Sequence, residues 1–591
     1  MARRGGGRAA VTAVLAVVVS LAGARPVAAE LSTPGFRAVG VAHAVDPISA
    51  LAVAPDGRLF AAIQAKGQTT APDPGTAEIR VYGSYVTTDG AVLDEGTVWA
   101  TVDGVRATTT EEGLLGLALA PDFATSKLVY VYLTTTDGDQ DQQIRVYREN
   151  GAGVGELLGT VATRLEPPTE SSSRNGGALG FGADGCLYVG VGDNGGGNRW
   201  NAQLLRGTDP IQSSESSALC TNVCLGPALY PARTVVNDDA PNDAGKVLRL
   251  AVEGAATAQP GPDAPLASQP FVFGAGLRNP VGLVAHPLTG QLYVAERGDS
   301  QEAEIDLVER GANLGWPCLE GALVSASGVA ACLAGLAPAD VYAHHAGWRA
   351  PLVSHATNPA LTGIAAYTGL GYPADYYGDV FYLLRQSARI YRLDLAPPCF
   401  LAGPAGTAPL AFHDATDDGD FSMLYDLDGD GEYENVSFGS LMAIVQGPNA
   451  LGQQVLYVAG KQGNSNALNE DSAIFRIEWA TALTPWTGPT GPVAESCFGD
   501  AGVENPFARP ACLPPGGPCP GQPDGTACDD GDPCNGAETC VGGICHHGTP
   551  LADGTACAGA TDCRAASACQ HGVCMPGASL PDGTACAADD P

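Results

Sequence analysis

Residues 426–435, DLDGDGEYEN, have the composition and spacing of a calcium-binding loop. Acidic residues occupy its first, third and fifth positions, and Gly431 at the sixth permits the sharp turn that such a loop needs. The twelfth position is Ser437 instead of the bidentate glutamate of an EF-hand, so we expect an EF-like structural loop, with a solvated acidic turn as the alternative. The oxygen ligands would come from Asp426, Asp428, Asp430 and the carbonyl group of Glu432.

A second stretch, SSSRNGGALGFGADGCLYVGVGDN (residues 171–194), combines seven glycines with a single cation, Arg174. Glycine lets the backbone reach positive φ values and come close to a flat ligand, although glycines that only make turns would look the same. A guanidinium can hold a carboxylate, but it stays protonated in proteins and cannot accept a proton. The stretch therefore predicts a ligand-approaching loop with a cation at its mouth.

These residues need a scaffold, and the chain shows a loose internal repeat over about residues 40–479. Each copy has a turn signal and an apolar strand, followed by a second strand that contains a polar residue. Six copies of small sheets predict an all-β fold, a six-bladed β-propeller, and the regular spacing argues against two β-sandwiches. The copies are 54–62 with 78–82, 120–133 with 143–147, 182–193 with 246–250, 286–297 with 304–308, 377–385 with 389–393, and 452–460 with 473–477.

The C-terminal part carries a second repeat, which is built on cysteine. Cysteines 528, 534, 540 and 545 recur 29 residues later at 557, 563, 569 and 574. Small disulfide-rich repeats, with two internal disulfides in each full unit, would hold a segment that has few large apolar residues. We expect a propeller over 38–480, a Pro/Gly/Thr-rich linker over 481–496 and this tail over 497–591; Cys186 and Cys399 have no obvious partner.

The N-terminus and the charge limit where the protein works and what it binds. Arginines followed by an apolar run and a small-residue cleavage site predict a signal peptide over residues 1–29 and an exported protein, placed in the periplasm, at the cell surface or outside the cell. No later stretch predicts a membrane span. The formal net charge of −34, from 64 acidic and 30 basic residues, disfavours nucleic acid as a partner and favours divalent cations.

Five motifs occur in an order that resembles the glucose/sorbosone dehydrogenase family over about residues 38–480. They are EEGLLGLALAPDF (111–123), NGGALGFGADGCLYVGVGDNG (175–195), GKVLRL (245–250), FGAGLRNPVGL (273–283) and ERGANLGWP (309–317). The resemblance implies a six-bladed propeller that oxidises a sugar or polyol with pyrroloquinoline quinone (PQQ) and calcium and passes the electrons to an unknown acceptor. A more distant likeness, to the propeller of Hedgehog-interacting proteins, implies a binding module.

The resemblance also assigns cofactor-binding residues. Arg278 and Asn279 match the Arg-Asn pair that contacts the quinone, and a guanidinium suits the carboxylates of PQQ. Arg385 and Arg389 lie near further cationic positions of the family, although either one could face solvent. The family's calcium turn corresponds to Gly298 and Asp299, next to Arg297, which would repel a cation.

The catalytic base of the family, a histidine, corresponds to Arg174, which cannot serve as a base. Three readings remain open. Another group, such as His344 or His345, has taken over; or the protein is a catalytically inactive propeller that binds carbohydrate or protein at the cell surface; or the base lies elsewhere in the sequence.

Overall fold

The computed structural model describes residues 28–499 with gaps, Pro506, and short stretches between 527 and 575. The largest gaps up to residue 499 are 67–74, 84–95, 164–172, 194–234, 253–270, 325–348, 402–409, 414–420, 426–433, 463–471 and 484–491. The predicted signal peptide up to residue 27, the ligands of the predicted loop (Asp426, Asp428, Asp430 and Glu432), and His344 and His345 lie outside the described residues. No helix in the described ranges is long and apolar enough to cross a membrane.

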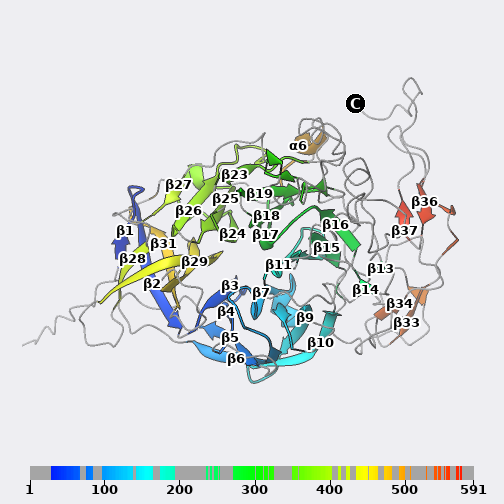
Figure 1. Cartoon of the computed structure of the whole chain (residues 1–591), viewed down its shortest axis with the longest axis horizontal. Coiled ribbons are helices and arrows are strands. Elements are labelled where there is room, and N and C mark those ends of the chain that lie inside the picture. Colours follow the sequence, from blue (N-terminus) through cyan, green and yellow to red (C-terminus); the bar gives the residue numbers. More distant parts are fainter. Residues whose placement is uncertain are drawn as a thin grey trace, which may run out of the picture.

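Six antiparallel sheets form the blades of a β-propeller, which confirms the predicted fold class (Figure 1). The first three blades follow the chain order. Blade 1 is β3 (Ile48–Val53), β4 (Leu59–Ile63), β5 (Gly75–Tyr82) and β6 (Thr97–Val105). Blade 2 is β7 (Leu114–Leu119), β8 (Leu128–Thr134), β9 (Gln142–Glu149) and β10 (Gly155–Thr163). Blade 3 is β11 (Gly176–Phe181), β12 (Leu187–Val191), β15 (Lys246–Leu250) and β16 (Phe271–Ala275), with β20 (Ala312–Asn313) added in parallel to β16.

The last three blades complete the ring. Blade 4 is β17 (Pro280–Ala285), β18 (Leu292–Glu296), β19 (Glu302–Val308) and β23 (Val353–Ala356). Blade 5 is β24 (Leu361–Tyr367), β25 (Asp379–Leu384), β26 (Arg389–Leu393) and β27 (Leu410–Phe412). Blade 6 is β29 (Glu434–Pro448), β30 (Gln454–Gln462), β31 (Ser472–Trp479) and β2 (Phe36–Ala44), flanked by β28 (Phe421–Tyr425) and β1 (Ala28–Glu30).

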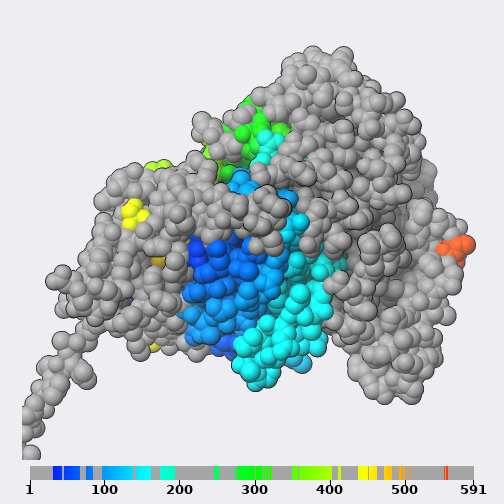
Figure 2. Space-filling view, turned by 60° about the horizontal axis from the view of Figure 1, so that its bottom comes forward, coloured from blue at the N-terminus to red at the C-terminus, as the bar shows by residue number. Residues whose placement is uncertain are grey.

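Each predicted repeat copy corresponds to the second and third strands of one blade. The pairs are β4 with β5, β8 with β9, β12 with β15, β18 with β19, β25 with β26 and β30 with β31. Strand β2, from the N-terminal end, pairs with β31 and so completes blade 6 and closes the ring. Large apolar side chains fill the space between neighbouring blades, as in the cluster that joins blades 1 and 2. In Figure 2 these two blades form one continuous surface, where the outer strands β6 and β10 contact each other.

The first strand of each blade lines the centre of the ring. These inner strands contact one another in the cyclic order β3, β7, β11, β17, β24, β29 and back to β3. In every blade the pairing register between the inner strand and the second strand is interrupted by a bulge. The bulge lies near the start of the inner strand in blades 1 to 5 and near residue 442 of the long β29 in blade 6. A bulge of this kind turns a side chain out of the regular alternation. The ring therefore presents a set of bulged residues at one end of its central axis.

The start of the predicted tail is attached to the propeller. Cys399, which follows β26, forms a disulfide with Cys497 in the short helix α6 (Ser496–Gly499), so Cys399 has a partner that its sequence context did not indicate. Val493 donates a backbone hydrogen bond to Leu288 in blade 4. Further on, strands β32 (Ala527–Cys528), β33 (Glu538–Val541) and β34 (Ile544–His546) form one small sheet, and β35 (Ala556–Ala558), β36 (Ser567–Gln570) and β37 (Val573–Met575) form another. Each strand of the second sheet starts 29 residues after its counterpart, which fits the predicted repeat.

Candidate functional site

A pocket lies at the end of the ring axis where the bulges gather. The bulged residues of five inner strands line it: Ser49, Leu115, Val281, Thr362 and Met442. In blade 3 the bulged residue is Gly177, which has a φ of +110° and whose added Cβ would lie 2.6 Å from Leu115 Cβ. A side chain there would be strained and would clash with the pocket wall. This close approach explains the second glycine of the Asn-Gly-Gly motif.

The rim of the pocket is polar and comes mainly from loops that enter the inner strands. Its polar residues are Gln64, Thr110, Glu111, Asn175, Asn279, Arg297 and Arg385. The loop before β7 is fixed by Gln64, whose amide donates hydrogen bonds to the carbonyls of Thr110 and Glu112 at 2.7 and 2.8 Å. Asn175 holds the Glu111 carbonyl at 2.7 Å, and Asn279 Oδ1 accepts from the Gly176 N–H at 2.9 Å. Blades 2, 3 and 4 are thus joined by side-chain amides at the pocket.

Arg278 lies behind this rim and is 9% exposed. Its Nη2 contacts Asp299 at 2.9 Å, and its Nη1 donates to the carbonyls of Arg297 and Gly298. Its guanidinium lies 5.8 Å from the ring centre of Trp316, within cation–π range. Burial, and then the neighbouring Arg174, lower the pKa of Arg278. Within the part of the chain that the structure describes, the buried Nε has no hydrogen-bond partner.

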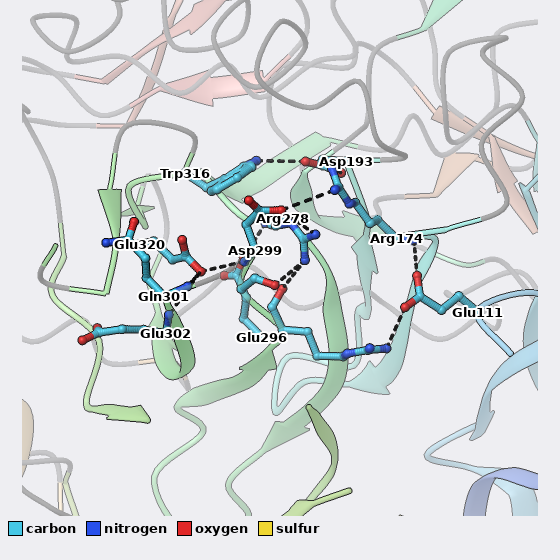
Figure 3. A network of polar contacts seen from close by, with 12 residues as sticks. Glu111, Arg174, Asp193, Arg278, Glu296, Asp299, Gln301, Glu302, Trp316 and Glu320 are labelled. Atoms are coloured by element: carbon cyan, nitrogen blue, oxygen red, sulfur yellow. Dashed lines mark hydrogen bonds and ion pairs between the residues drawn. The ribbon is translucent and has the colours of Figure 1, made fainter. Parts of the chain in front are cut away.

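Arg174 points toward the same carboxylate from the other side (Figure 3). Its Nη2 lies 3.3 Å from Asp299, and its Nη1 lies 3.9 Å from Asp193, which also accepts a hydrogen bond from Trp316. Its backbone has a φ of 64°, and its N–H donates to Glu111 at 2.5 Å. Arg174 stands beside the pocket and does not line it, so its guanidinium does not take the place of a base directed at a substrate.

Glu111 and Arg297 face each other across the pocket rim. Glu111 Oε1 lies 3.0 Å from Arg297 Nη1, and both side chains are between one fifth and one quarter exposed. Arg297 lies in the turn after β18, where the sequence predicted that it would disturb a cation site. The pair brings together a carboxylate from blade 2 and a guanidinium from blade 4 that are far apart in the sequence.

The predicted calcium turn at Gly298 and Asp299 does not fit a metal ion. The Gly298 carbonyl accepts a hydrogen bond from Arg278, and Asp299 Oδ1 is shared by Arg278 and Arg174. Guanidinium groups therefore occupy the directions from which a cation would be held, and two positive charges would repel it. Gly298 itself is required by packing, because an added Cβ would meet the backbone oxygen of Glu302.

A second acidic group lies nearby within blade 4. The carboxyls of Glu296, Glu304 and Asp306 all lie within 4.8 Å of one another and are all buried. Burial raises the pKa of Asp306 to about 8, and burial together with the Asp306 charge raises the pKa of Glu296 and Glu304 well above the ordinary value. Within the described residues neither carboxyl oxygen of Asp306 has a hydrogen-bond partner. We call these three residues the carboxyl triad.

The carboxyl triad is connected to the arginine network. Glu296 accepts the backbone N–H of Arg278, and Glu304 accepts the backbone N–H of Gly321. Glu296 and Glu304 face each other on β18 and β19, and Asp306 follows Glu304 by two residues on the same face of its strand. Three buried carboxylates repel one another, and a divalent cation between them would offset this repulsion. Their oxygen atoms are also the ligands that a hard cation prefers. The triad is therefore the candidate metal centre among the described residues.

The structure brings together most of the predicted cofactor residues. Asn279 and Arg385 line the pocket, and Arg278 lies behind its rim, where it donates to the Gly298 carbonyl. Arg389, at the start of β26, is half-buried and does not line the pocket. Sequence reasoning missed Glu111, Asp193, Trp316 and the triad. The triad had one local signal: Glu304 and Asp306 interrupt an apolar strand at alternate positions.

Comparison with known proteins shows to which family the chain belongs. A family model described as Glucose / Sorbosone dehydrogenase matches residues 48–208 and 232–397. Quinoprotein glucose dehydrogenase B of Acinetobacter calcoaceticus is 25% identical over 278 residues, which are 46% of this chain and 50% of that protein. Aldose sugar dehydrogenase YliI of Escherichia coli (strain K12) is 25% identical over 222 residues, 35% of this chain and 46% of that protein.

The matched length is limited. The chain spans about half the length of the curated relatives it matches. Among solved structures, the PQQ-bound form of aldose sugar dehydrogenase from Streptomyces coelicolor shares 19% identity with a TM-score of 0.42, and covers 74% of this chain and 96% of that one.

Proposed function

The chain belongs to the glucose/sorbosone dehydrogenase family, and we propose on this basis that it is an exported oxidoreductase that oxidises sugars or related alcohols with PQQ and calcium. The observation that carries the proposal is the pocket on the ring axis, where Arg297, Arg385 and Asn279 line a rim backed by buried Arg278. Guanidinium and amide groups are the donors that a planar polycarboxylate needs.

The donors suit PQQ. The quinone carries three carboxylates, and Arg278 keeps a buried Nε without a partner in the described chain. When bound, PQQ would supply the electrophilic carbonyl that accepts a hydride. The pocket encloses about 70 Å³, less than the roughly 300–1,000 Å³ of typical ligand sites. We therefore expect rim side chains such as Arg297 to move aside when the cofactor enters.

For calcium we propose the carboxyl triad in place of the Gly298–Asp299 turn. Oxygen-only ligands and full burial favour calcium over softer metals. An ion there would neutralise Glu296, which holds the Arg278 backbone, and so would stabilise the wall of the quinone pocket. The predicted loop at 426–435 remains a separate proposal for a structural calcium.

A reconstitution experiment tests the proposed function. The purified chain is titrated with PQQ in the presence of calcium, with binding followed by absorbance, and dye reduction is then measured with a panel of aldoses and polyols. Saturable binding with sugar-dependent dye reduction supports the proposal. No PQQ binding by the calcium-loaded protein refutes it. The dye takes the place of the natural electron acceptor in this assay.

The second candidate is a catalytically inactive propeller that binds carbohydrate or protein. Arg174 at the position of the family's base favours it, because this residue is bound to Asp299 and cannot accept a proton. PQQ binding without turnover on any sugar would favour this candidate.

A further inference from the structure

The pocket holds one group that can replace the missing histidine. Oxidation of a hydroxyl needs a proton acceptor within reach of the substrate, and general-base catalysis typically contributes roughly 10²–10⁴-fold in rate. Among the described residues that line the pocket, the ionisable ones are Glu111, Arg297 and Arg385. Arginine cannot act as the acceptor. We propose that Glu111 is the catalytic base, an inference that rests on the proposed dehydrogenase function.

Glu111 is positioned for this role. Asn175 holds its carbonyl at 2.7 Å, and the N–H of Arg174 donates to Oε2 at 2.5 Å, so the carboxylate is fixed at the rim. The other oxygen lies 3.0 Å from Arg297 Nη1. The Arg174 backbone thus orients the base, while its side chain is turned away toward Asp299.

The other carboxylates of the network are less suited. Asp299 Oδ1 is shared by two guanidinium groups, and Asp193 is fully buried against Trp316 and Arg174. Neither lines the pocket. His286 is buried, and its Nε2 contacts the Gly378 carbonyl at 2.7 Å in the blade 4–5 interface, so it does not serve the pocket either.

The reaction balances with these groups. The hydroxyl proton of the substrate would pass to the Glu111 carboxylate, and bound PQQ would supply the acceptor for the hydrogen that leaves the same carbon with its electron pair. A C=O bond would form as the O–H and C–H bonds break, so that the sugar would lose the two electrons that the quinone would accept. The proton then leaves Glu111 for water. Arg297, next to Glu111, stabilises the negative charge that develops on the substrate oxygen.

The test compares Glu111→Gln with the wild type and with Glu156→Gln, an exposed glutamate on β10 that serves as the matched control. We expect Glu111→Gln to lose roughly 10²–10⁴-fold in kcat and the control to keep it. The variant should bind PQQ at least as tightly as the wild type, because a negative charge next to an anionic ligand has been removed. Thermal melting checks that both variants are folded.

Two rescue measurements separate a chemical role from a structural one. Added formate should restore at least about tenfold of the activity of Glu111→Ala, because a small carboxylate can occupy the vacated space. Arg174→His introduced into Glu111→Gln should restore turnover by returning a base to the family's position. A folded Glu111→Gln that binds PQQ and retains wild-type kcat overturns the proposal while the dehydrogenase function stands. A wild type that binds PQQ without turnover means instead that the proposed function has failed, and the base assignment falls with it.

Discussion

Replacing Asp306 by asparagine should stabilise the protein in the absence of metal, although it alters a fully buried side chain. Burial raises the pKa of Asp306 from 3.8 to about 8. In the unfolded chain this group is ionised near neutral pH, whereas in the folded protein it must take up a proton. The stability associated with Asp306 is therefore fully present below about pH 4 and is lost progressively as the pH rises toward about 8.

The magnitude follows from the difference between the two pKa values. At about pH 7 the penalty is about 4 kcal/mol, and at about pH 5 it is about 2 kcal/mol. Asparagine removes this penalty but leaves an amide that lacks partners, which costs about 1–3 kcal/mol. We expect Asp306→Asn to gain about 1–3 kcal/mol at about pH 7 and little at about pH 5. Above about pH 8, where Asp306 would ionise in the folded protein, its replacement would also relieve Glu296 and Glu304.

Calcium should make the wild type more stable than Asp306→Asn, which reverses the order of stability expected without metal. An ion held by the triad stabilises the wild type by about 2.7 kcal/mol at a hundredfold excess over its dissociation constant, because it binds only the folded state. The variant loses one of the three ligands and should gain much less. The wild type should also respond to calcium more strongly at about pH 8 than at about pH 5, since the ligands must be deprotonated to bind the ion.

The assay is urea denaturation with and without EDTA, repeated with millimolar calcium, at about pH 5 and about pH 7. Asp394→Asn is the matched control, because its side chain is 62% exposed and its removal should change stability by less than about 0.5 kcal/mol. A metal-free Asp306→Asn that is less stable than the wild type at about pH 7 would show that burial of the Asp306 carboxyl does not destabilise the folded protein. Full calcium stabilisation of the variant would place the ion elsewhere.

Three further predictions follow from single contacts. Arg278→Lys should weaken PQQ binding by roughly 10–100-fold in an absorbance titration, because lysine cannot reproduce the planar fork of the guanidinium. Cys497→Ser should lower stability by about 2–4 kcal/mol, because the bond to Cys399 closes a sequence separation of 98 residues. A reductant should destabilise the wild type more than the variant, since the variant has already lost this bond. Burial lowers the pKa of His286 from 6.5 to about 4, so its contribution to stability is present above about pH 6.5 and is lost as the pH falls toward about 4. This acid sensitivity is worth about 3 kcal/mol. His286→Gln should reduce it, as measured by melting curves taken across that pH range.

The sequence predicted the blades well where local patterns repeat. The second and third strands of every blade were found because turn signals precede apolar strands such as those around Leu187 and Leu292. The inner strands were not part of the predicted copies, because bulges interrupt their pairing and their geometry depends on the neighbouring blades. The bulges that form the pocket are visible only in the pairing register.

The site was predicted less completely, for a physical reason. Arg278 and Asn279 stand in a motif, whereas Glu111 meets Arg297 only because ring closure brings blades 2 and 4 to the same axis. Alternating acids in a strand usually face solvent, so Asp306 gave no sign of its burial. The disulfide between Cys399 and Cys497 likewise joins residues that only the folded structure brings together.

The distribution of charge over the whole protein gives an independent argument for an anionic ligand. The chain has 64 acidic and only 30 basic residues, yet two arginines (297 and 385) line one pocket and two more (174 and 278) lie next to it. Three carboxylates, Glu111, Asp193 and Asp299, pair with Arg174, Arg278 and Arg297, whereas Arg385 brings a further guanidinium to the pocket lining. Solubility does not require such a cluster, and folding disfavours it, because Arg174 and burial both lower the pKa of Arg278. A ligand that carries several negative charges would offset this cost on binding, which is the property that PQQ would bring to the pocket.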